Sequence, residues 1–320
     1  MVRVVSLALA ALMGSIVGTT GGASAQSYPQ QVVHLVVPFS AGSITDGLAR
    51  ILADKLGELW KQQVIVENRP GLPGTTAVAK SAPDGYTLML TSNGHTIAGA
   101  INKSIQFDPV KDFAGVSRVA AVPLVAIVPP DFPANTVKEF IARAKEKPGQ
   151  LNFSSAGVAS TSYLSAEIFK QDAKINIVHI PYKGAPEATT AVIRNDAQLY
   201  FAPIPATRDL SATGKVKAIG INSARRVSQL PQVPTIAEAL PEYKYESWFG
   251  VLAPAGTPRD ILAKVSDDIA KVLRMEDVKD KLLAQGSIPA PTTPAELDAI
   301  NKADTERYGK ILRDAGIVPQ

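Results

Sequence analysis

Two loops of the sequence combine serine, glycine and threonine in a pattern that suits the binding of an anion. The first covers residues 39–46 (FSAGSITD), and the second covers residues 153–161 (FSSAGVAST). Each places Ser-Ala-Gly between an apolar segment and the start of an amphipathic segment. Glycine lets the backbone approach a ligand closely, and a helix start presents N–H donors that have no partner within the helix. The helix dipole also favours negative charge there, so we expect an anion at these loops.

Each loop also has a purely structural interpretation. Ser43 and Asp46 fit a capping box, with Ser43 as the N-cap and Asp46 folding back at the third helical position. Capping residues of this kind begin many helices that bind no ligand. The recurrence once in each half of the chain favours a functional role, in which two helix starts face each other and hold a carboxylate. Neither loop contains Arg or Lys, so we expect neutral donors.

A third candidate loop covers residues 91–95 (TSNGH) and follows another apolar run. It places Ser92, Asn93 and His95 where a parallel strand would end, which is where α/β proteins bind ligands. His95 fits a ligand contact and an exposed loop histidine equally well. Tyr182 also follows an apolar run, and it fits either a ligand contact or a packing residue whose hydroxyl is satisfied locally.

The elements that position these loops alternate between apolar runs and amphipathic segments. Continuous β-branched runs predict buried strands, and apolar residues at helical spacing predict helices. The order strand, loop, helix, repeated, indicates an α/β fold with mostly parallel sheets. The predicted strands are 32–37, 64–66, 86–90, 122–128, 151–154, 177–180, 199–202, 216–222 and 247–253. The predicted helices are 48–59, 137–147, 163–170, 185–195, 258–273 and 294–315, and residues 68–74 read as a turn-rich loop.

Residues 1–25 are predicted to be a signal peptide rather than part of the fold. Arg3 precedes an apolar stretch over 4–17, and Ala23-Ser24-Ala25 fits the cleavage rule. The alternative is an uncleaved membrane anchor. Removal leaves 320 − 25 = 295 residues, enough for one large domain or two lobes. We therefore expect an exported, periplasmic protein.

The composition excludes several classes of function. The chain has no cysteine, which removes thiol catalysis and cysteine-ligated metals. Its three histidines are far apart in sequence and the net charge is only +4, so we expect no metal site, no cofactor and no nucleic-acid partner. The nucleophile elbow, the Walker loop, the Gly-x-Gly-x-x-Gly fingerprint and the zinc-protease motif are all missing.

Several segments, in order along the chain, resemble a known family. They are 36–42 (VVPFSAG), 66–71 (VENRPG), 82–88 (APDGYTL), 107–113 (FDPVKDF), 180–184 (IPYKG), 230–235 (LPQVPT) and 248–254 (WFGVLAP). They are similar to the Bug-type extracytoplasmic receptors, which are the solute-binding proteins of tripartite tricarboxylate transporters. The resemblance covers essentially all of the chain after residue 25.

This resemblance implies a two-lobed periplasmic-binding-protein fold of type II, a Venus flytrap. The first lobe would hold residues 27–127 and 249–320, and the second would hold 128–248. The protein would be a monomer that delivers a small carboxylate to membrane transporter subunits. Family ligands include citrate, acidic amino acids, nicotinate and aromatic dicarboxylates. The expected ligand-binding residues are Ser40, Ala41, Gly42, Ser43, Thr45 and Asp46 in the first lobe, and Ser155, Ala156, Gly157, Ser160 and Thr161 in the second.

Two departures from the family pattern bear on the ligand. Phe201, Ala202 and Pro203 stand where a more polar loop is common, and they are included as ligand contacts. His95 stands where small hydroxyl residues are common. Both changes favour a weakly polar acid, including an aromatic one.

Two alternatives to a transport receptor predict different behaviour. A secreted hydrolase with a loop serine as nucleophile and His95 as base would turn a substrate over. A ligand-sensing receptor for a membrane signalling protein would share the fold and bind without turnover. The expected function is a solute-binding protein and not an enzyme.

Overall fold

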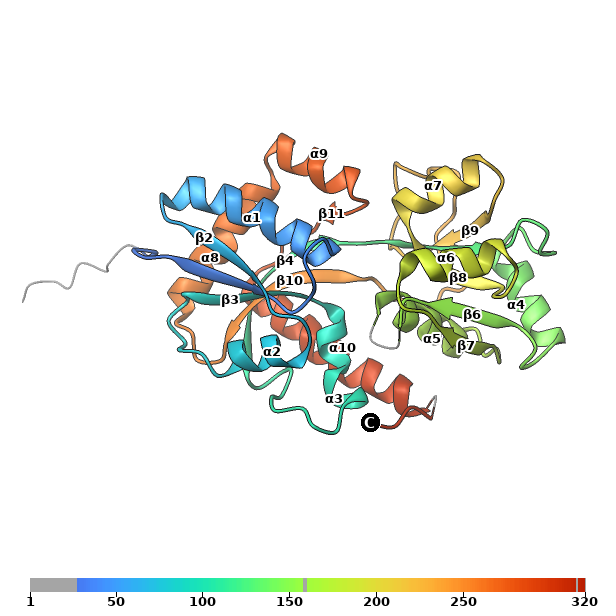
Figure 1. Ribbon diagram of the computed structural model, residues 1–320, viewed down its shortest axis with the longest axis horizontal. Coiled ribbons are helices and arrows are strands. Elements are labelled where there is room, and N and C mark those ends of the chain that lie inside the picture. The colour runs from blue at the N-terminus through green and yellow to red at the C-terminus, as the bar shows by residue number, and fades with distance from the viewer. Residues whose placement is uncertain (1–27, 158–159, 315, 320) are drawn as a thin grey trace, which may run out of the picture.

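A computed structural model describes residues 28–157, 160–314 and 316–319. The predicted signal peptide over residues 1–25 lies outside them. The chain forms two α/β lobes side by side, and each lobe is built on its own sheet (Figure 1). This confirms the predicted two-lobed fold class. Among the described residues, no helix combines the length and the apolar character that crossing a bilayer requires.

The first lobe is built on a six-stranded sheet in the order β11-β4-β10-β3-β1-β2. Its core is formed by apolar side chains of the sheet and of the helices on its faces, as the continuous apolar strands predicted. Its strands are β1 (Val33–Val37), β2 (Val64–Asn68), β3 (Thr87–Ser92), β4 (Phe113–Ala121), β10 (Trp248–Pro254) and β11 (Ile288–Pro289). Its helices are α1 (Ile44–Trp60), α2 (Leu72–Ala79), the 3-10 turn η1 (Asn93–Ile97), α3 (Ala98–Ile101), α8 (Arg259–Leu273), α9 (Glu276–Ala284) and α10 (Pro294–Asp314).

The second lobe is built on a five-stranded sheet in the order β7-β6-β8-β5-β9. Its strands are β5 (Leu124–Val128), β6 (Asn152–Ser155), β7 (Val178–Pro181), β8 (Leu199–Pro203) and β9 (Lys217–Ile221). Its helices are α4 (Val137–Glu146), α5 (Thr161–Asp172), α6 (Ala185–Ile193), α7 (Ile204–Ala212) and the 3-10 turn η2 (Ile236–Glu238).

The chain passes between the lobes twice through adjacent strands. It leaves the first sheet at the end of β4 and enters the second at the start of β5, and it returns between β9 and β10 (Figure 1). The whole of β5 pairs within the second sheet, so the sheet changes between Ala121 and Leu124 rather than at the predicted boundary of 127 and 128.

The expectation of mostly parallel sheets needs a correction, because each sheet is mixed. β1 pairs in parallel with β2 and β3, and β6 pairs in parallel with β7 and β8. In contrast, β10 is antiparallel to β3 and β4, and β5 is antiparallel to β8 and β9. The antiparallel pairs all involve strands next to the two crossings or the short edge strand β11. The two Ser-Ala-Gly loops follow β1 and β6, which pair in parallel with both of their neighbours.

The C-terminal helix α10 joins both lobes. Near its start, Asp298 accepts a 2.6 Å hydrogen bond from the Gly115 N–H of β4 in the first lobe. Near its end, Tyr308, Ile311 and Leu312 are buried in the same apolar cluster as Phe169 of the second lobe. The helix that was predicted over 294–315 therefore contributes to the packing of two lobes rather than one.

Candidate functional site

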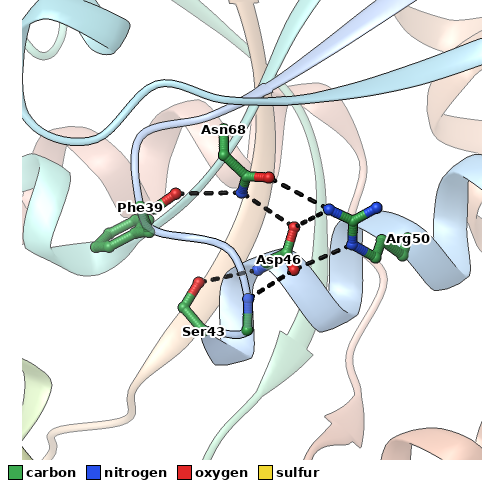
Figure 2. Close-up of polar contacts among 6 residues, drawn as sticks. Phe39, Ser43, Asp46, Arg50 and Asn68 are labelled. Atoms are coloured by element: carbon green, nitrogen blue, oxygen red, sulfur yellow. Dashed lines mark hydrogen bonds and ion pairs between the residues drawn. The ribbon is translucent and has the colours of Figure 1, made fainter.

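The first candidate loop is held by a compact network around Asp46 at the start of α1 (Figure 2). The Ser43 hydroxyl accepts a 3.2 Å hydrogen bond from the Asp46 N–H, as the predicted N-cap requires. The Asp46 carboxylate in turn accepts a 2.8 Å hydrogen bond from the Gly42 N–H. In a capping box the side chain at the third helical position accepts a hydrogen bond from the N–H of the N-cap residue. Here the donor is Gly42, one residue before the N-cap Ser43.

Asp46 is 4% exposed and is used by the protein itself rather than left for a ligand. Its Oδ2 accepts from Arg50 Nε at 3.1 Å, and its Oδ1 accepts from the Asn68 side chain at 3.0 Å (Figure 2). Burial raises the pKa of Asp46, but hydrogen bonds from Arg50, from the Gly42 N–H and from Asn68 outweigh burial and hold the pKa below its ordinary value. The charged Asp46 carboxylate therefore holds the loop in its conformation.

The exposed part of this loop offers neutral donors at the lobe junction. Ser40, Ala41 and Gly42 are exposed, and the start of α1 lies on the side of the first lobe that faces the second (Figure 1). Ile44 and Thr45 are the first two residues of α1, so their N–H groups have no partner within the helix. Thr45 is itself buried, at 2% exposure.

The second candidate loop repeats the capped helix start in the other lobe. The Ser160 hydroxyl accepts from the Tyr163 N–H at 3.2 Å and donates to Gly157 O at 2.6 Å. The Ser162 hydroxyl accepts a 3.1 Å hydrogen bond from the Ala156 N–H. Gly157 has φ of +109°, a backbone conformation that favours glycine. The predicted residues 155–157 are thus hydrogen-bonded to residues 160–162 at the start of α5.

A contact that the sequence did not predict lies behind this loop. The Ser155 hydroxyl lies 2.7 Å from His179 Nε2, and it accepts a 3.1 Å hydrogen bond from the Gly157 N–H. His179 lies on β7, whose parallel register with β6 places it opposite Phe153. Burial, with repulsion from Lys170, lowers the pKa of His179 to about 4, so its ring is neutral near pH 7. Pairing of the two strands 151–154 and 177–180 in register would have revealed this contact.

The placement of His95 corrects the expectation that it faces solvent or a ligand. It is 5% exposed, and its ring packs against Phe107 and Phe113 at centroid distances of 5.9 and 4.7 Å. Its Nε2 lies 2.9 Å from Pro109 O, and burial lowers its pKa to about 4. His95 is thus part of the core of the first lobe, because η1 turns back into the lobe directly after β3.

The neighbours of His95 in the third loop also lie inside. The Ser92 hydroxyl caps η1 through a 3.3 Å hydrogen bond from the Gly94 N–H. Asn93 is 0% exposed and its Nδ2 donates to the Tyr245 hydroxyl at 3.0 Å. Tyr245 belongs to the chain segment that returns from the second lobe, so Asn93 lies at the lobe junction, and its buried Oδ1 has no hydrogen-bond partner among the described residues.

The apolar segment after β8 is less accessible than the sequence indicated. Phe201 and Ala202 are both 0% exposed and belong to the two cores on opposite faces of the second sheet. Pro203 is partly exposed at the start of α7. Because side chains of one strand alternate between faces, two consecutive apolar residues of an internal strand are both buried. Phe201 and Ala202 therefore give no reason to expect a weakly polar ligand.

Tyr182 lies beside the second loop and packs against the core, which is the second of the two interpretations that the sequence left open. Its N–H donates to Ser155 O at 2.9 Å and its half-buried ring packs against the core of the second lobe. The candidate site thus offers backbone N–H groups and hydroxyls at two helix starts. No group of three or more acidic or histidine side chains suited to a metal ion occurs in the part of the chain that the structure describes.

Comparison with known proteins assigns these features to one family. Residues 48–317 match the model of the tripartite tricarboxylate transporter family receptor. The chain is 33% identical to Protein BugT of Bordetella pertussis over 317 residues, with 96% of this chain and 97% of that protein covered.

Two solved structures of similar proteins contain organic acids. R. palustris Rpa4515 with adipate is 32% identical, with a TM-score of 0.76 and coverage of 92% of this chain and 100% of that chain. MatC from Rhodopseudomonas palustris with bound malate is 29% identical, with a TM-score of 0.72 and coverage of 89% and 100%. The family is one of receptors, and other similar solved structures are the periplasmic binding protein BugD and a TctC solute binding protein from Polaromonas, which rules against the hydrolase alternative.

Family members are periplasmic binding proteins, and the resemblance read from the sequence motifs is confirmed. The two lobes, the capped helix start in each and the family match agree with one another, and the chain belongs to the tripartite tricarboxylate transporter receptor family.

Proposed function

We propose that the protein is a periplasmic receptor that holds one small dicarboxylate between its lobes and delivers it to a tripartite transporter. The observation that carries this proposal is the pair of capped helix starts, one at Ser43 in the first lobe and one at Ser160 in the second. Each offers unpaired N–H donors and the positive end of a helix dipole. Two such ends match a ligand with two carboxylates, and adipate and malate in the similar structures are both dicarboxylates.

The site suits a fully charged acid without using a cation. The charge of Arg50 is already directed at Asp46, with Nη2 3.0 Å from Oδ1. Neutral hydrogen-bond donors in a fixed arrangement bind an anion without the cost of removing water from a second charge. Closing of the two lobes around the acid would then complete the set of donors.

A thermal-shift screen on protein that starts at Gln26 tests the ligand class. The panel contains adipate, malate, citrate, glutamate, benzoate and terephthalate, together with glucose as a neutral control. The proposal predicts that a dicarboxylate raises the melting temperature and that glucose does not. Stabilisation by glucose alone, or by benzoate and not by any dicarboxylate, would contradict it.

Delivery to a transporter is tested separately. Protein loaded with the acid should co-purify with the membrane subunits of a tripartite transporter from detergent extracts of the native host. Recovery of a membrane signalling protein instead would support the alternative of a ligand-sensing receptor.

A further inference from the structure

We infer that His179 is a positioning residue for the second carboxylate-binding loop, which it holds in place by accepting a hydrogen bond from the Ser155 hydroxyl. This inference rests on the proposed function, because it concerns how that loop is prepared for the ligand. His179 was not among the residues expected to contribute to the site.

The geometry places His179 behind the loop rather than in contact with a ligand. Ser155 is the last residue of β6 and is 0% exposed. Its Oγ lies 2.7 Å from His179 Nε2 and 3.1 Å from the Gly157 nitrogen. The three groups form a chain from the imidazole through the hydroxyl to a backbone N–H of the loop.

The position of the ring is fixed by aromatic packing on both sides. The His179 ring stacks on Phe153 at a centroid distance of 4.8 Å and contacts Tyr163 at 4.6 Å. Phe153 belongs to β6 and Tyr163 to the first turn of α5, so the same contacts hold the strand and the helix that flank the loop. The ring therefore presents Nε2 to Ser155 in one orientation.

Proton counting assigns the direction of the hydrogen bond. A serine hydroxyl has one proton to donate and two lone pairs that accept. Ser155 already accepts from the Gly157 N–H, and a buried hydroxyl proton needs an acceptor. Among the described residues His179 Nε2 is at the right distance, so Ser155 donates to Nε2 and the neutral ring carries its proton on Nδ1.

Burial and the charge of Lys170 keep His179 in this neutral form. Lys170 of α5 disfavours a second positive charge, while Glu167 of the same helix is paired with Lys170 at 3.0 Å. The other titratable group of α5 that contacts the His179 ring is Tyr163. The hydrogen-bond partner of the ring from β6 is Ser155. The lowered pKa leaves Nε2 free to accept at pH 6 to 8.

The hydrogen bonds from His179 through Ser155 to the Gly157 N–H set the backbone conformation at Gly157. The Ser155 bond fixes the Gly157 N–H, while Gly157 O accepts from the Ser160 hydroxyl at 2.6 Å. The same Ser160 hydroxyl caps α5, so the bond network extends from His179 to the helix start. Without His179 the Ser155 hydroxyl would turn to another acceptor, and the loop would have to be ordered at the expense of binding energy.

A double-mutant cycle separates positioning from simple stabilisation. His179→Phe keeps an aromatic ring between Phe153 and Tyr163 but removes the acceptor, and Ser155→Ala removes the donor. We expect each change to lower stability and to weaken dicarboxylate binding by about tenfold. In the double variant the buried hydroxyl that lost its acceptor is gone, so part of the stability lost in His179→Phe should return. The Gly157 N–H still lacks its partner, so affinity should stay about tenfold weaker.

Two further variants sharpen the comparison. His179→Gln retains an acceptor and should keep affinity within about threefold of the wild type. Ser154→Ala is the matched control, because the neighbouring buried Ser154 hydroxyl donates to Ala188 O at 2.9 Å, away from the loop. It should lower stability without changing affinity.

Nitrogen-15 NMR of the histidine ring gives an independent measurement. We expect the proton on Nδ1 in the wild type at pH 7, and a loss of that single tautomer in Ser155→Ala. A ring protonated on Nε2, or an affinity that recovers together with stability in the double variant, would overturn the role of His179. A wild-type protein that binds no dicarboxylate would instead refute the proposed function itself, and with it this inference.

Discussion

The Asn93 side-chain amide donates a 3.0 Å hydrogen bond to the Tyr245 hydroxyl and so joins the two lobes. Asn93 begins η1 in the first lobe, while Tyr245 lies on the segment that returns from the second. The same hydroxyl donates to Thr161 O, the first residue of α5, at 3.5 Å. A buried tyrosine therefore connects a loop of the first lobe with the start of α5 in the second.

Tyr245→Phe should loosen both ends of this connection. The change leaves the buried Asn93 amide without its acceptor, and a cost of about 1–3 kcal/mol in unfolding free energy is expected. Urea unfolding measures the cost, and hydrogen exchange should increase in η1 and at the start of α5. Tyr243→Phe is the control, because the Tyr243 hydroxyl donates to Ser165 O within the second lobe, at 3.4 Å. Unchanged exchange in η1 of the Tyr245 variant would contradict the connection.

Ser160→Ala should reduce stability and ligand affinity together. Its hydroxyl caps α5 at the site, and loss of an N-cap costs about 1 kcal/mol. Thr136→Ala removes an equivalent cap from α4, where the hydroxyl accepts from the Glu139 N–H at 3.2 Å, on a helix at the far side of the second lobe (Figure 1). Calorimetric titration should show weaker dicarboxylate binding for the Ser160 variant alone. Equal affinities in the two variants would show that the α5 start does not contact the ligand.

The contribution of Asp46 to stability should disappear in acid. The folded-state pKa lies below the ordinary value of 3.8, so the charged carboxylate favours the folded protein. Its contribution is complete above about pH 4 and is lost as the pH falls through the lowered pKa. Melting temperatures measured from pH 7 down to about pH 2 should therefore converge for the wild type and Asp46→Asn. A constant difference at every pH would show that the charge of Asp46 contributes nothing.

Gly286→Ala tests a close contact between the lobes beside the α9–β11 turn. A Cβ on Gly286 would lie 2.9 Å from Pro205 Cδ at the start of α7 in the second lobe. Gly214→Ala is the matched control, since Gly214 also has positive φ (+68° against +75°) but no neighbour within 4 Å of a Cβ. We expect backbone strain to lower the unfolding free energy of both variants by about 1 kcal/mol. Only Gly286→Ala should lose more stability and show a changed affinity for the dicarboxylate, because its Cβ meets Pro205. Identical effects would argue against this contact between the lobes.

Local chemistry made much of the fold predictable. The predicted strand 32–37 and helix 137–147 agree with β1 and α4 almost residue for residue, because β-branched runs and helical periodicity report burial directly. Strand β4 was missed, although it lies inside the first sheet, since its polar residues Ser117 and Arg118 interrupt the apolar pattern. The Ser117 hydroxyl donates to backbone carbonyls, and Arg118 pairs with Glu246, a partner 128 residues away that a sequence pattern does not show.

Helix α2 was missed for a different reason. Residues 68–74 contain two prolines and two glycines and read as a loop, but Pro73 occupies the first turn of the helix, where its missing N–H costs nothing. The helix begins after Gly71 rather than after the turn-rich segment ends.

The site was predictable where chemistry is local and not where it depends on strand pairing. Ser43 and Ser160 were identified as parts of helix starts from their neighbours alone. The burial of His95 and the contact of His179 with Ser155 both depend on partners that lie in separate segments of the chain. Phe201 was misplaced because its exposure is decided by the helices that cover its sheet.

Isothermal titration of the purified protein with adipate and malate tests the central claim most directly. The account predicts saturable binding of at least one of these dicarboxylates, with one molecule per chain and no conversion of the acid recovered afterwards. Binding should be weakened by Ser160→Ala and unaffected by Thr136→Ala. No heat with either acid, or consumption of the acid during the titration, would contradict a receptor that closes two helix starts on one dicarboxylate.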